Sequence, residues 1–319
     1  METPKKPGKS ESYGSPTTPQ TPRTPQTPSP EESNEIKSFD RRKNFIKIDG
    51  FLKSLTKQEI CSLGKVFKNP IRFGKSQEAQ VGKKAKVVKS SQAFRIEIDS
   101  SFGMAAKIMK NTPRNMREIE WYYYFMDKYP NFPNFPLVSK YEICDVCSVS
   151  KTYNQKDWIQ EVVEQENCIV LFSELADGDL QSQKRDMNEK EIASMVSQVL
   201  MILLIFEQKE IIHYDLNFGN LLFHNQTVEL SYLDGQITIP SEGKVWTIWD
   251  LEMMSKNEDP IPFDAEIKPK VKNTFEVDWK TTFLPKLVDY FHDSTFVQHV
   301  REITNLPTTT TIWEVIVQL

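Results

Sequence analysis

Apolar residues begin to recur regularly at Phe39, and their spacing predicts secondary structure from there on. Four strand-like runs separated by Gly and Ser predict a small antiparallel sheet. These runs cover residues 66–73, 80–88, 93–98 and 104–109. Residues 115–127 contain no Gly or Pro and carry apolar side chains near helical spacing, so one helix is expected after the strands. A further strand is expected at 168–172, before a turn-rich connector at 176–180.

The second half of the chain has a mainly helical pattern. Asn188 and Glu191 have the spacing of a capping box, and the apolar stripe over 192–203 predicts a helix with one face in the core. Helical spacing returns at 277–291, whereas the last apolar run, 311–317, fits helix or strand. Short strands are expected at 221–223, 228–233, 237–239 and 245–249. Strands first and helices later predict a two-lobed α+β protein.

Residues 1–38 have a different composition, dominated by Pro, Ser, Thr and charged residues, with seven Ser/Thr-Pro pairs. Such a composition predicts a disordered tail. The pairs suit a proline-directed kinase as a partner, because each phosphate would add about −1.5 to −2 charge, or they form a polyproline-like spacer. Thr56-x-x-Glu59 has capping-box spacing and predicts a short helix within an N-terminal extension over 39–65.

The overall composition limits the classes of partner and compartment. A formal net charge of −4 provides no electrostatic footprint for nucleic acid or an anionic membrane. The longest apolar run, 199–206, is far shorter than the roughly 20 residues that cross a bilayer, and no N-terminal apolar segment resembles a signal peptide. We therefore expect an intracellular, cytoplasmic protein with no nucleic-acid and no membrane partner.

Four cysteines occur, at positions 61, 144, 147 and 168. This usage agrees with a reducing compartment. The pair Cys144-x-x-Cys147 suggests a zinc or redox site, but no second ligand pair has matching spacing and the four histidines are scattered. Two free thiols are therefore the favoured interpretation of this pair.

The most informative motif is His213-Tyr-Asp215-Leu-Asn-Phe-Gly-Asn220, which has the pattern H-x-D-L-x-x-x-N between apolar flanks. This spacing is typical of the catalytic loop in phosphoryl transfer, where few protein groups are needed. Asp215 is the candidate that orients an acceptor hydroxyl, and Asn220 is a candidate metal ligand. His213 is expected to support the loop without accepting the proton.

Other groups that this chemistry needs occur in the appropriate order along the chain. Lys107, in Ala-Ala-Lys-Ile, matches the V-A-I-K strand whose lysine contacts the α- and β-phosphates of a nucleotide. Asp250 follows an apolar strand and is a second candidate ligand for Mg²⁺, because a hard cation accepts carboxylate and amide oxygens. Glu118 is the preferred anionic partner of Lys107, and Glu120 remains the alternative.

The segment Gly74-Lys-Ser76-Gln-Glu-Ala79-Gln-Val81 matches the nucleotide-covering pattern G-x-G-x-x-G-x-V only with Ser and Ala in place of two glycines. Both replacements carry a Cβ atom, which restricts the close approach of backbone amides to phosphate. The segment is therefore either a nucleotide lid or an ordinary hairpin turn.

Together these motifs resemble the eukaryotic-type protein kinase superfamily over about residues 66–292. The resemblance implies a protein-kinase-like domain over 66–319, with an antiparallel-sheet lobe to about 174 and a mainly helical, shortened lobe from about 175. It implies ATP and Mg²⁺ as cofactors and a protein with a Ser/Thr acceptor as substrate. By the same resemblance, Glu174 and Ala176 would contact adenine through main-chain groups, Ser173 would lie beside the adenine pocket, and Asp179 would reach the ribose.

The chain also departs from typical members of that superfamily. Its long 232–246 hairpin and short carboxyl end resemble the divergent serine/threonine kinases of large DNA viruses, such as iridovirus-like ones, and its loop is similar to that of haspin-like kinases. A viral origin would imply host cytoplasm or the virion. Asn217 replaces a usual lysine, Glu252 replaces the D-F-G glycine, and no A-P-E triplet follows. Asp278 either braces the catalytic loop or is a surface acid.

Three functional hypotheses follow from these residues. The first is an active serine/threonine kinase, in which Asp215 orients the hydroxyl while Lys107 and the metal stabilise charge on the phosphoryl group. The second is a small-molecule phosphotransferase of the aminoglycoside/choline kinase type, against which Leu216 and the long hairpin argue. The third is an inactive scaffold, against which the retention of Lys107, Asp215, Asn220 and Asp250 argues.

Overall fold

The computed structural model describes residues 41–63, 70–72, 91–99, 102–154, 160–183, 186–256 and 273–319. The chain divides into two units, Met1–Lys37 and Ser38–Leu319, and every described residue belongs to the second. The disordered tail predicted at 1–38 and the strand predicted at 80–88 lie outside the described residues.

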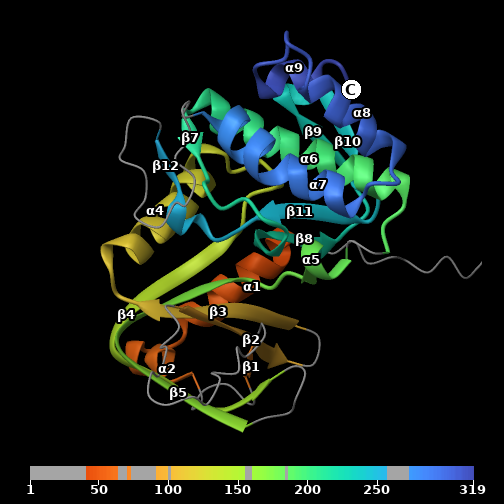
Figure 1. The fold of residues 1–319 in the computed structure, drawn as a ribbon. Coiled ribbons are helices and arrows are strands. Elements are labelled where there is room, and N and C mark those ends of the chain that lie inside the picture. The colour runs from red at the N-terminus through yellow and green to blue at the C-terminus, as the bar shows by residue number, and fades with distance from the viewer. Residues whose placement is uncertain are drawn as a thin grey trace, which may run out of the picture. The chain divides into compact units, whose positions relative to one another are not determined.

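Five strands of Ser38–Leu319 form a closed barrel in the order β1-β2-β3-β5-β4 (Figure 1). All the neighbouring pairs are antiparallel except β1 and β4, which are parallel and close the barrel. The strands are β1 Ile71–Arg72, β2 Ser91–Asp99, β3 Phe102–Lys110, β4 Val138–Asn154 and β5 Gln160–Glu174. The predicted strands at 93–98 and 104–109 coincide with β2 and β3. In β3, Ala106 and Ile108 face the core of the barrel, and Lys107 between them faces the other side.

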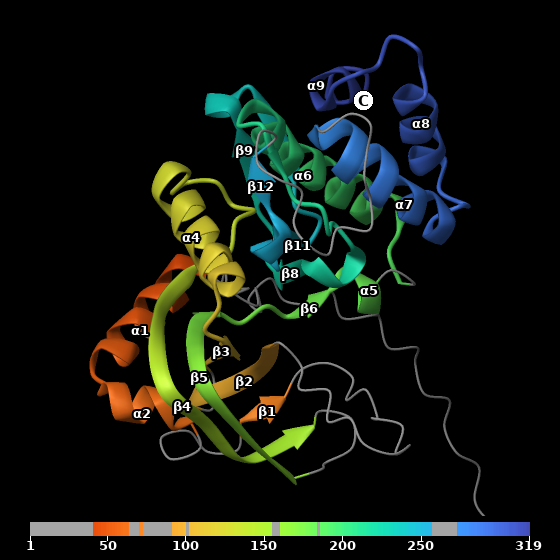
Figure 2. The same cartoon turned by 60° about the vertical axis from the view of Figure 1, so that its left-hand side comes forward.

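Among the described residues, three helices accompany the barrel: α1 Arg41–Lys53, α2 Lys57–Cys61 and α4 Pro113–Lys128. The capping box of Thr56 and Glu59 begins α2 as the sequence predicts. Helix α4 begins after Thr112, whose hydroxyl accepts the Asn115 N–H, and covers the predicted helix at 115–127. Figure 2 shows α1 and α2 beside β4 and β5, and their apolar residues belong to the same core as the barrel.

The later part of Ser38–Leu319 is mainly helical. It contains α5 Leu180–Gln183, α6 Glu189–Gln208, the π-helical η4 Phe275–Phe283, α7 Leu284–Tyr290, α8 Thr295–Thr304 and α9 Ile312–Ile316. Asn188 and Glu191 form the predicted capping box of α6. Length and composition would allow α6 to cross a membrane, but most of it is buried inside the protein. The run at 311–317, left open between helix and strand, is helical.

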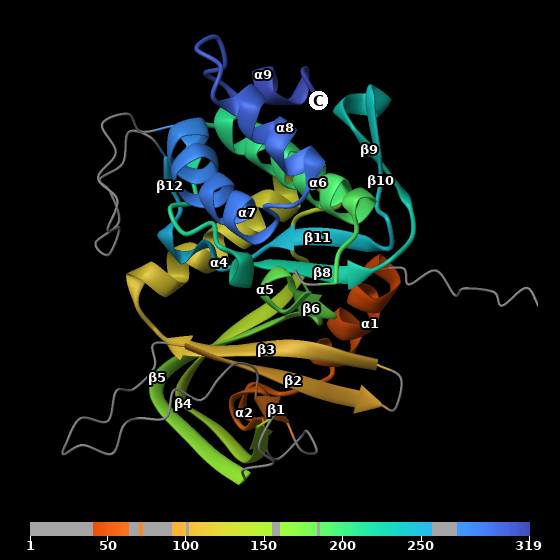
Figure 3. The same cartoon turned by 45° about the vertical axis from the view of Figure 1, so that its right-hand side comes forward.

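Short strands connect these helices and place the catalytic-type loop (Figure 3). Strand β8 Leu221–Asn225 lies between β6 Gly178–Asp179 and β11 Lys244–Ile248, while β9 Glu229–Tyr232 pairs with β10 Ile237–Pro240. Strand β7 Ile211–Ile212 pairs with β12 Ser255–Lys256. The described residues include 3₁₀ turns at η1 Phe218–Asn220, η2 Leu233–Gly235 and η3 Leu251–Met253. Because β8 and β11 are antiparallel, the start of β8 lies beside the end of β11.

The predicted α+β class is confirmed, with an antiparallel sheet first and helices later. Two large hydrophobic cores lie in the described part of the chain. One joins the barrel strands to α1 and α2, and the other surrounds α6 and includes α4 together with Met109, Val138 and Leu171 of the barrel strands. The barrel and the later helical part are the two lobes, and the second core extends from one to the other.

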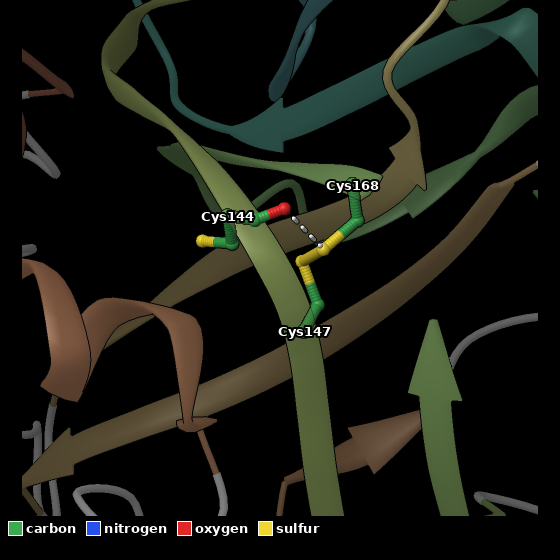
Figure 4. Close-up of side chains that lie close together, drawn as sticks. All are labelled: Cys144, Cys147 and Cys168. Atoms are coloured by element: carbon green, nitrogen blue, oxygen red, sulfur yellow. Dashed lines mark hydrogen bonds between the residues drawn. A yellow bond between two sulfur atoms is a disulfide. The ribbon is translucent and has the colours of Figure 1, made fainter. Parts of the chain in front are cut away.

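The four cysteines form disulfides, whereas the sequence analysis favoured free thiols. Cys61 is joined to Cys144, and Cys147 is joined to Cys168, so the expectation for the Cys144-x-x-Cys147 pair is wrong. Figure 4 shows the Cys147–Cys168 disulfide against the backbone of Cys144. Sequence spacing did not reveal this pairing, because the partners come from different elements and meet only in the folded barrel.

Candidate active site

Lys107 lies between two carboxylates that come from separate parts of the fold. Its Nζ is 2.7 and 2.8 Å from the two carboxylate oxygens of Glu118 on α4, and 3.0 Å from Oδ1 of Asp250. Glu118 is fully buried, whereas Glu120 is exposed on another face of the helix. The strand alternation of β3 therefore presents Lys107 to α4, and the helix presents Glu118 in return.

The carboxylates of Glu118 and Asp250 stabilise the positive charge of Lys107. Burial alone would lower the pKa of Lys107, but the carboxylates of Glu118 and Asp250 raise it above its ordinary value. Burial would likewise raise the pKa of Asp250, yet Lys107 holds it below its ordinary value. Both shifts favour the charged forms, an ammonium group on Lys107 and a carboxylate on Asp250.

The carboxylate of Asp215 is fixed by two amides of its own loop. Asn220 Nδ2 donates to Asp215 Oδ2 at 3.1 Å and to its carbonyl oxygen at 2.9 Å. Asn217 Nδ2 donates to Asp215 Oδ1 at 3.0 Å, while Asn217 Oδ1 accepts the Gly219 N–H at the start of η1. Because its nitrogen is used in this way, Asn220 has its amide oxygen left for other ligands.

His213 connects this loop to the residue before Asp250. The ring is fully buried, and burial lowers the pKa of His213, which favours the neutral form. Its Nδ1 accepts the Asp215 N–H at 3.2 Å, and its Nε2 lies 3.2 Å from the carbonyl oxygen of Trp249. In that neutral form Nε2–H donates to Trp249, so His213 supports the loop structurally.

Asp278 braces the same loop from η4. Its side chain is fully buried and accepts the backbone N–H groups of His213 at 2.7 Å and Tyr214 at 2.9 Å. The sequence left open whether Asp278 braces the catalytic loop or is a surface acid, and in the structure it braces the loop. Burial raises the pKa of Asp278 to about 7, against the effect of the two N–H donors.

Tyr122 is a site residue that sequence reasoning missed. Its hydroxyl donates to Glu118 Oε1 at 2.9 Å and accepts the Asp250 N–H at 3.1 Å. Asp250 has a left-handed backbone with φ of 61°, so this contact supports an unusual conformation at the residue. The i, i+4 spacing from Glu118 would have pointed to Tyr122.

Ser173 and Glu174 of the linker are buried, whereas Ala176 and Asp179 are half-buried. The Glu174 carboxylate pairs with Arg41 and accepts the Leu137 N–H at 2.9 Å, and the Glu174 N–H donates to the Leu137 carbonyl oxygen at 2.9 Å. Ser173 is buried and its hydroxyl donates to the Glu174 carbonyl oxygen at 3.2 Å. Ala176 follows the end of β5. Asp179 Oδ1 accepts the Ser182 N–H at 2.8 Å and thereby caps α5, leaving its other oxygen for a ligand.

The candidate residues of the nucleotide lid all lie outside the described residues: Gly74, Ser76, Ala79 and Val81. The segment 257–272, which follows Asp250 and β12, also lies outside them.

Four main candidates converge on one site, namely Lys107, Asp215, Asn220 and Asp250. Trp249 N–H donates to the Asn220 carbonyl oxygen at 2.8 Å, which holds Asp250 next to the Asp215 loop. Lys107 contacts Asp250 directly, and Asn220 contacts Asp215. The Asp250 carboxylate and the Asn220 amide oxygen fit a Mg²⁺ ion, because this donor set consists of hard oxygen atoms.

No protein-family model and no curated protein sequence matches this chain. Among solved structures, the chain is similar to one described as the crystal structure of the yeast RNA Pol II CTD kinase CTDK-1 complex. The two share 16% sequence identity with a TM-score of 0.42, and the alignment covers 78% of this chain and 67% of that chain. A likeness at this level carries no argument about function, so the residues of the site have to supply it.

Proposed function

We propose that the protein is an ATP- and Mg²⁺-dependent serine/threonine protein kinase. The observation that carries this proposal is the position of Lys107 Nζ, 2.7 Å from Glu118 and 3.0 Å from Asp250, beside the loop in which Asn220 holds Asp215. A fixed cation, two oxygen ligands for a metal and an oriented carboxylate are the groups that phosphoryl transfer requires. The convergence of all four groups from distant parts of the chain supports kinase activity over a chance motif.

Each group has a specific role in this proposal. Lys107 presents a positive charge to the phosphates of the nucleotide, and Glu118 keeps its side chain in place. Asp250 and Asn220 would hold Mg²⁺, which neutralises charge on the phosphate oxygens when bound. Asp215 accepts the proton of the attacking hydroxyl, and the amides of Asn217 and Asn220 hold the carboxylate in position.

A transfer assay with labelled ATP and Mg²⁺ tests this function. Generic protein substrates form one arm, and sugars, choline and aminoglycosides form the other. We expect phosphate on serine or threonine in the protein arm and its loss in Asp215→Asn. Asp234→Asn, the same change at an exposed position of η2, is the matched control and should keep full activity. Consumption of ATP only with small molecules would instead support the phosphotransferase alternative.

The scaffold alternative is tested by nucleotide binding. A ligand that binds only the native state raises the unfolding temperature, so Mg-ATP should stabilise the wild-type protein. Lys107→Met should remove most of that shift, because the cation that faces the phosphates is lost. A wild-type protein with neither a thermal shift nor transfer activity would favour the scaffold.

A further inference from the structure

The four cysteines gather at one buried point of the barrel, and neither the disulfide pairing alone nor the kinase proposal requires this. Cys61 ends α2, Cys144 and Cys147 lie on β4, and Cys168 lies on β5. Each is at most 9% exposed. The sulfur atoms of Cys144, Cys147 and Cys168 lie within 4.8 Å of one another, and Cys61 is bonded to the first of them.

Two cysteines of β4 lie at the centre of this cluster. Residues three apart in a strand face opposite sides, and the register of β4 with β5 is regular across residues 144–147. Both Cys144 and Cys147 are nevertheless buried, the first next to Cys61 of α2 and the second next to Cys168 of β5, while Asp145 and Val146 between them are exposed. On the neighbouring strand, Cys168 is paired directly with Cys144 in the register of β4 and β5.

The end of α2 brings the fourth sulfur to the same place. Ser62, next to Cys61, forms a parallel bridge with Ser148, next to Cys147. The Cα–Cα distances are 5.8 Å for Cys61 and Cys144, and 6.1 Å for Cys147 and Cys168. The Cys168 sulfur also lies 3.5 Å from the Cys144 carbonyl oxygen, along the dashed line in Figure 4.

We propose that the reduced form of this cluster is a tetrahedral Cys₄ site for one Zn²⁺ ion. Zn–S bonds of about 2.3 Å place the four sulfurs of such a site about 3.8 Å apart, a spacing that fits inside the 4.8 Å within which the sulfurs of Cys144, Cys147 and Cys168 lie of one another. Two disulfides need only two sulfurs each, whereas a zinc site needs all four around one point. The missing second C-x-x-C pair is replaced by Cys61 and Cys168, which the fold supplies from two other elements.

The change between the two forms balances chemically. Two equivalents of a dithiol reductant together donate four electrons and four protons to the two protein disulfides and become two small-molecule disulfides, leaving four thiols on the protein. Zn²⁺ then displaces the four thiol protons to solvent and forms four Zn–S bonds. In the reverse direction, two equivalents of a small-molecule disulfide accept the four electrons, take up four protons as thiols, restore the two protein disulfides and release Zn²⁺, so the site links zinc content to the redox state of the first lobe.

The test begins with the full chain, purified under a phosphine reductant and without chelator from zinc-supplemented cells. Elemental analysis should find about one Zn²⁺ per chain, and a mercurial that binds thiolates should release it. Co²⁺ exchanged into the protein should give the visible bands of tetrahedral thiolate coordination. These measurements need no variant, so they stand even if a cysteine substitution prevents folding.

Variants then locate the site. Cys147→Ser and Cys168→Ser should lose most of the bound zinc, whereas Val146→Ser places a serine in the same motif and should keep it. Oxidation of the wild type should release zinc and produce the Cys61–Cys144 and Cys147–Cys168 linkages in peptide mapping. A reduced, folded protein with four titratable thiols that binds neither Zn²⁺ nor Co²⁺ would overturn the proposal. Zinc that thiol reagents do not release would also overturn it. Neither result depends on kinase activity.

Discussion

Arg41 and Glu174 form a buried ion pair that connects α1 to the end of β5, where the linker between the lobes begins. The Arg41 Nε donates to Glu174 Oε2 at 2.8 Å, and its Nη2 donates to the carbonyl oxygen of Phe135 at 3.0 Å. Burial would raise the pKa of Glu174, but Arg41 and His224 hold it below its ordinary value. Helix α1 is therefore an integral support of the linker.

Arg41→Ala should destabilise the protein strongly. The substitution leaves the Glu174 carboxylate buried without its cation, which costs about 3–5 kcal/mol in comparable pairs. Urea unfolding measures the change in the free energy of unfolding. Lys53→Ala on the same helix removes an exposed ion pair with Asp49 and should cost about 0.5 kcal/mol or less.

A double-substituted chain checks the cause of the Arg41 effect. Glu174→Gln removes the buried charge, so Arg41→Ala should cost less in that background than in the wild type. Equal costs in the two backgrounds would mean that Arg41 acts through packing or its backbone contacts and not through the ion pair.

Tyr122→Phe should lower the rate of phosphoryl transfer by about tenfold, equivalent to about 1.4 kcal/mol in the activation free energy. The hydroxyl joins Glu118 to the backbone of Asp250, so its removal loosens the metal ligand relative to Lys107. Steady-state kinetics at saturating Mg-ATP measures kcat. Tyr124→Phe keeps the ring contacts of the same helix and should leave kcat unchanged. If both variants behave alike, the Tyr122 hydroxyl does not position the site.

Local patterns in the sequence predicted the strands and helices whose formation depends on neighbouring residues along the chain. The strands β2 and β3 alternate in burial, the helix expected at 115–127 lies within α4, and α6 begins at its predicted capping box. Most of the β4–β5 hairpin was missed, and only 168–172 was expected within it. Strand β4 carries Lys140, Glu142 and Asp145 and has irregular register, so neither composition nor period 2 indicates a strand.

The residues of the site likewise fall into those that the sequence predicted and those that it did not. The order of Lys107, Glu118, Asp215, Asn220 and Asp250 is readable because phosphoryl transfer needs those residue types at known spacings. The Tyr122 spacing of i, i+4 from Glu118 was a usable local signal, but its contact with Asp250 and the contact of Arg41 with Glu174 join residues 128 and 133 positions apart, which no local pattern encodes. The cysteine pairing was missed for the same reason, since it depends on where α2 lies against β4 and on the register of β4 with β5.

Asn217→Ala should lower kcat by about tenfold. The amide of Asn217 is one of two that hold the Asp215 carboxylate, and a hydrogen bond to a charged group contributes about 1.5–3 kcal/mol. Asn225→Ala, at an exposed position at the end of β8, is the matched control and should retain wild-type kcat. A loss confined to the KM for ATP would contradict a role in positioning Asp215, which faces the acceptor in the proposed mechanism.

Asp278 should make the stability of the protein depend on pH. Burial raises its pKa to about 7 in the native state, while the unfolded chain has an ordinary value near 3.8. Between these values the native state binds a proton that the unfolded state releases. The contribution to stability is therefore fully present below pH 3.8 and is lost as the pH rises through 7, with a slope of at most about 1.4 kcal/mol per pH unit.

Asp278→Asn removes this titration and keeps an oxygen that accepts from the loop. Denaturant unfolding of both proteins at steps across that window gives the difference in their free energies of unfolding, in which other titrating groups cancel. We expect the wild type to lose stability relative to Asp278→Asn as the pH rises, because its buried carboxyl must ionise. A difference that stays constant across the window would mean that Asp278 is already ionised in the native state. The N–H groups of His213 and Tyr214 would then outweigh the effect of burial.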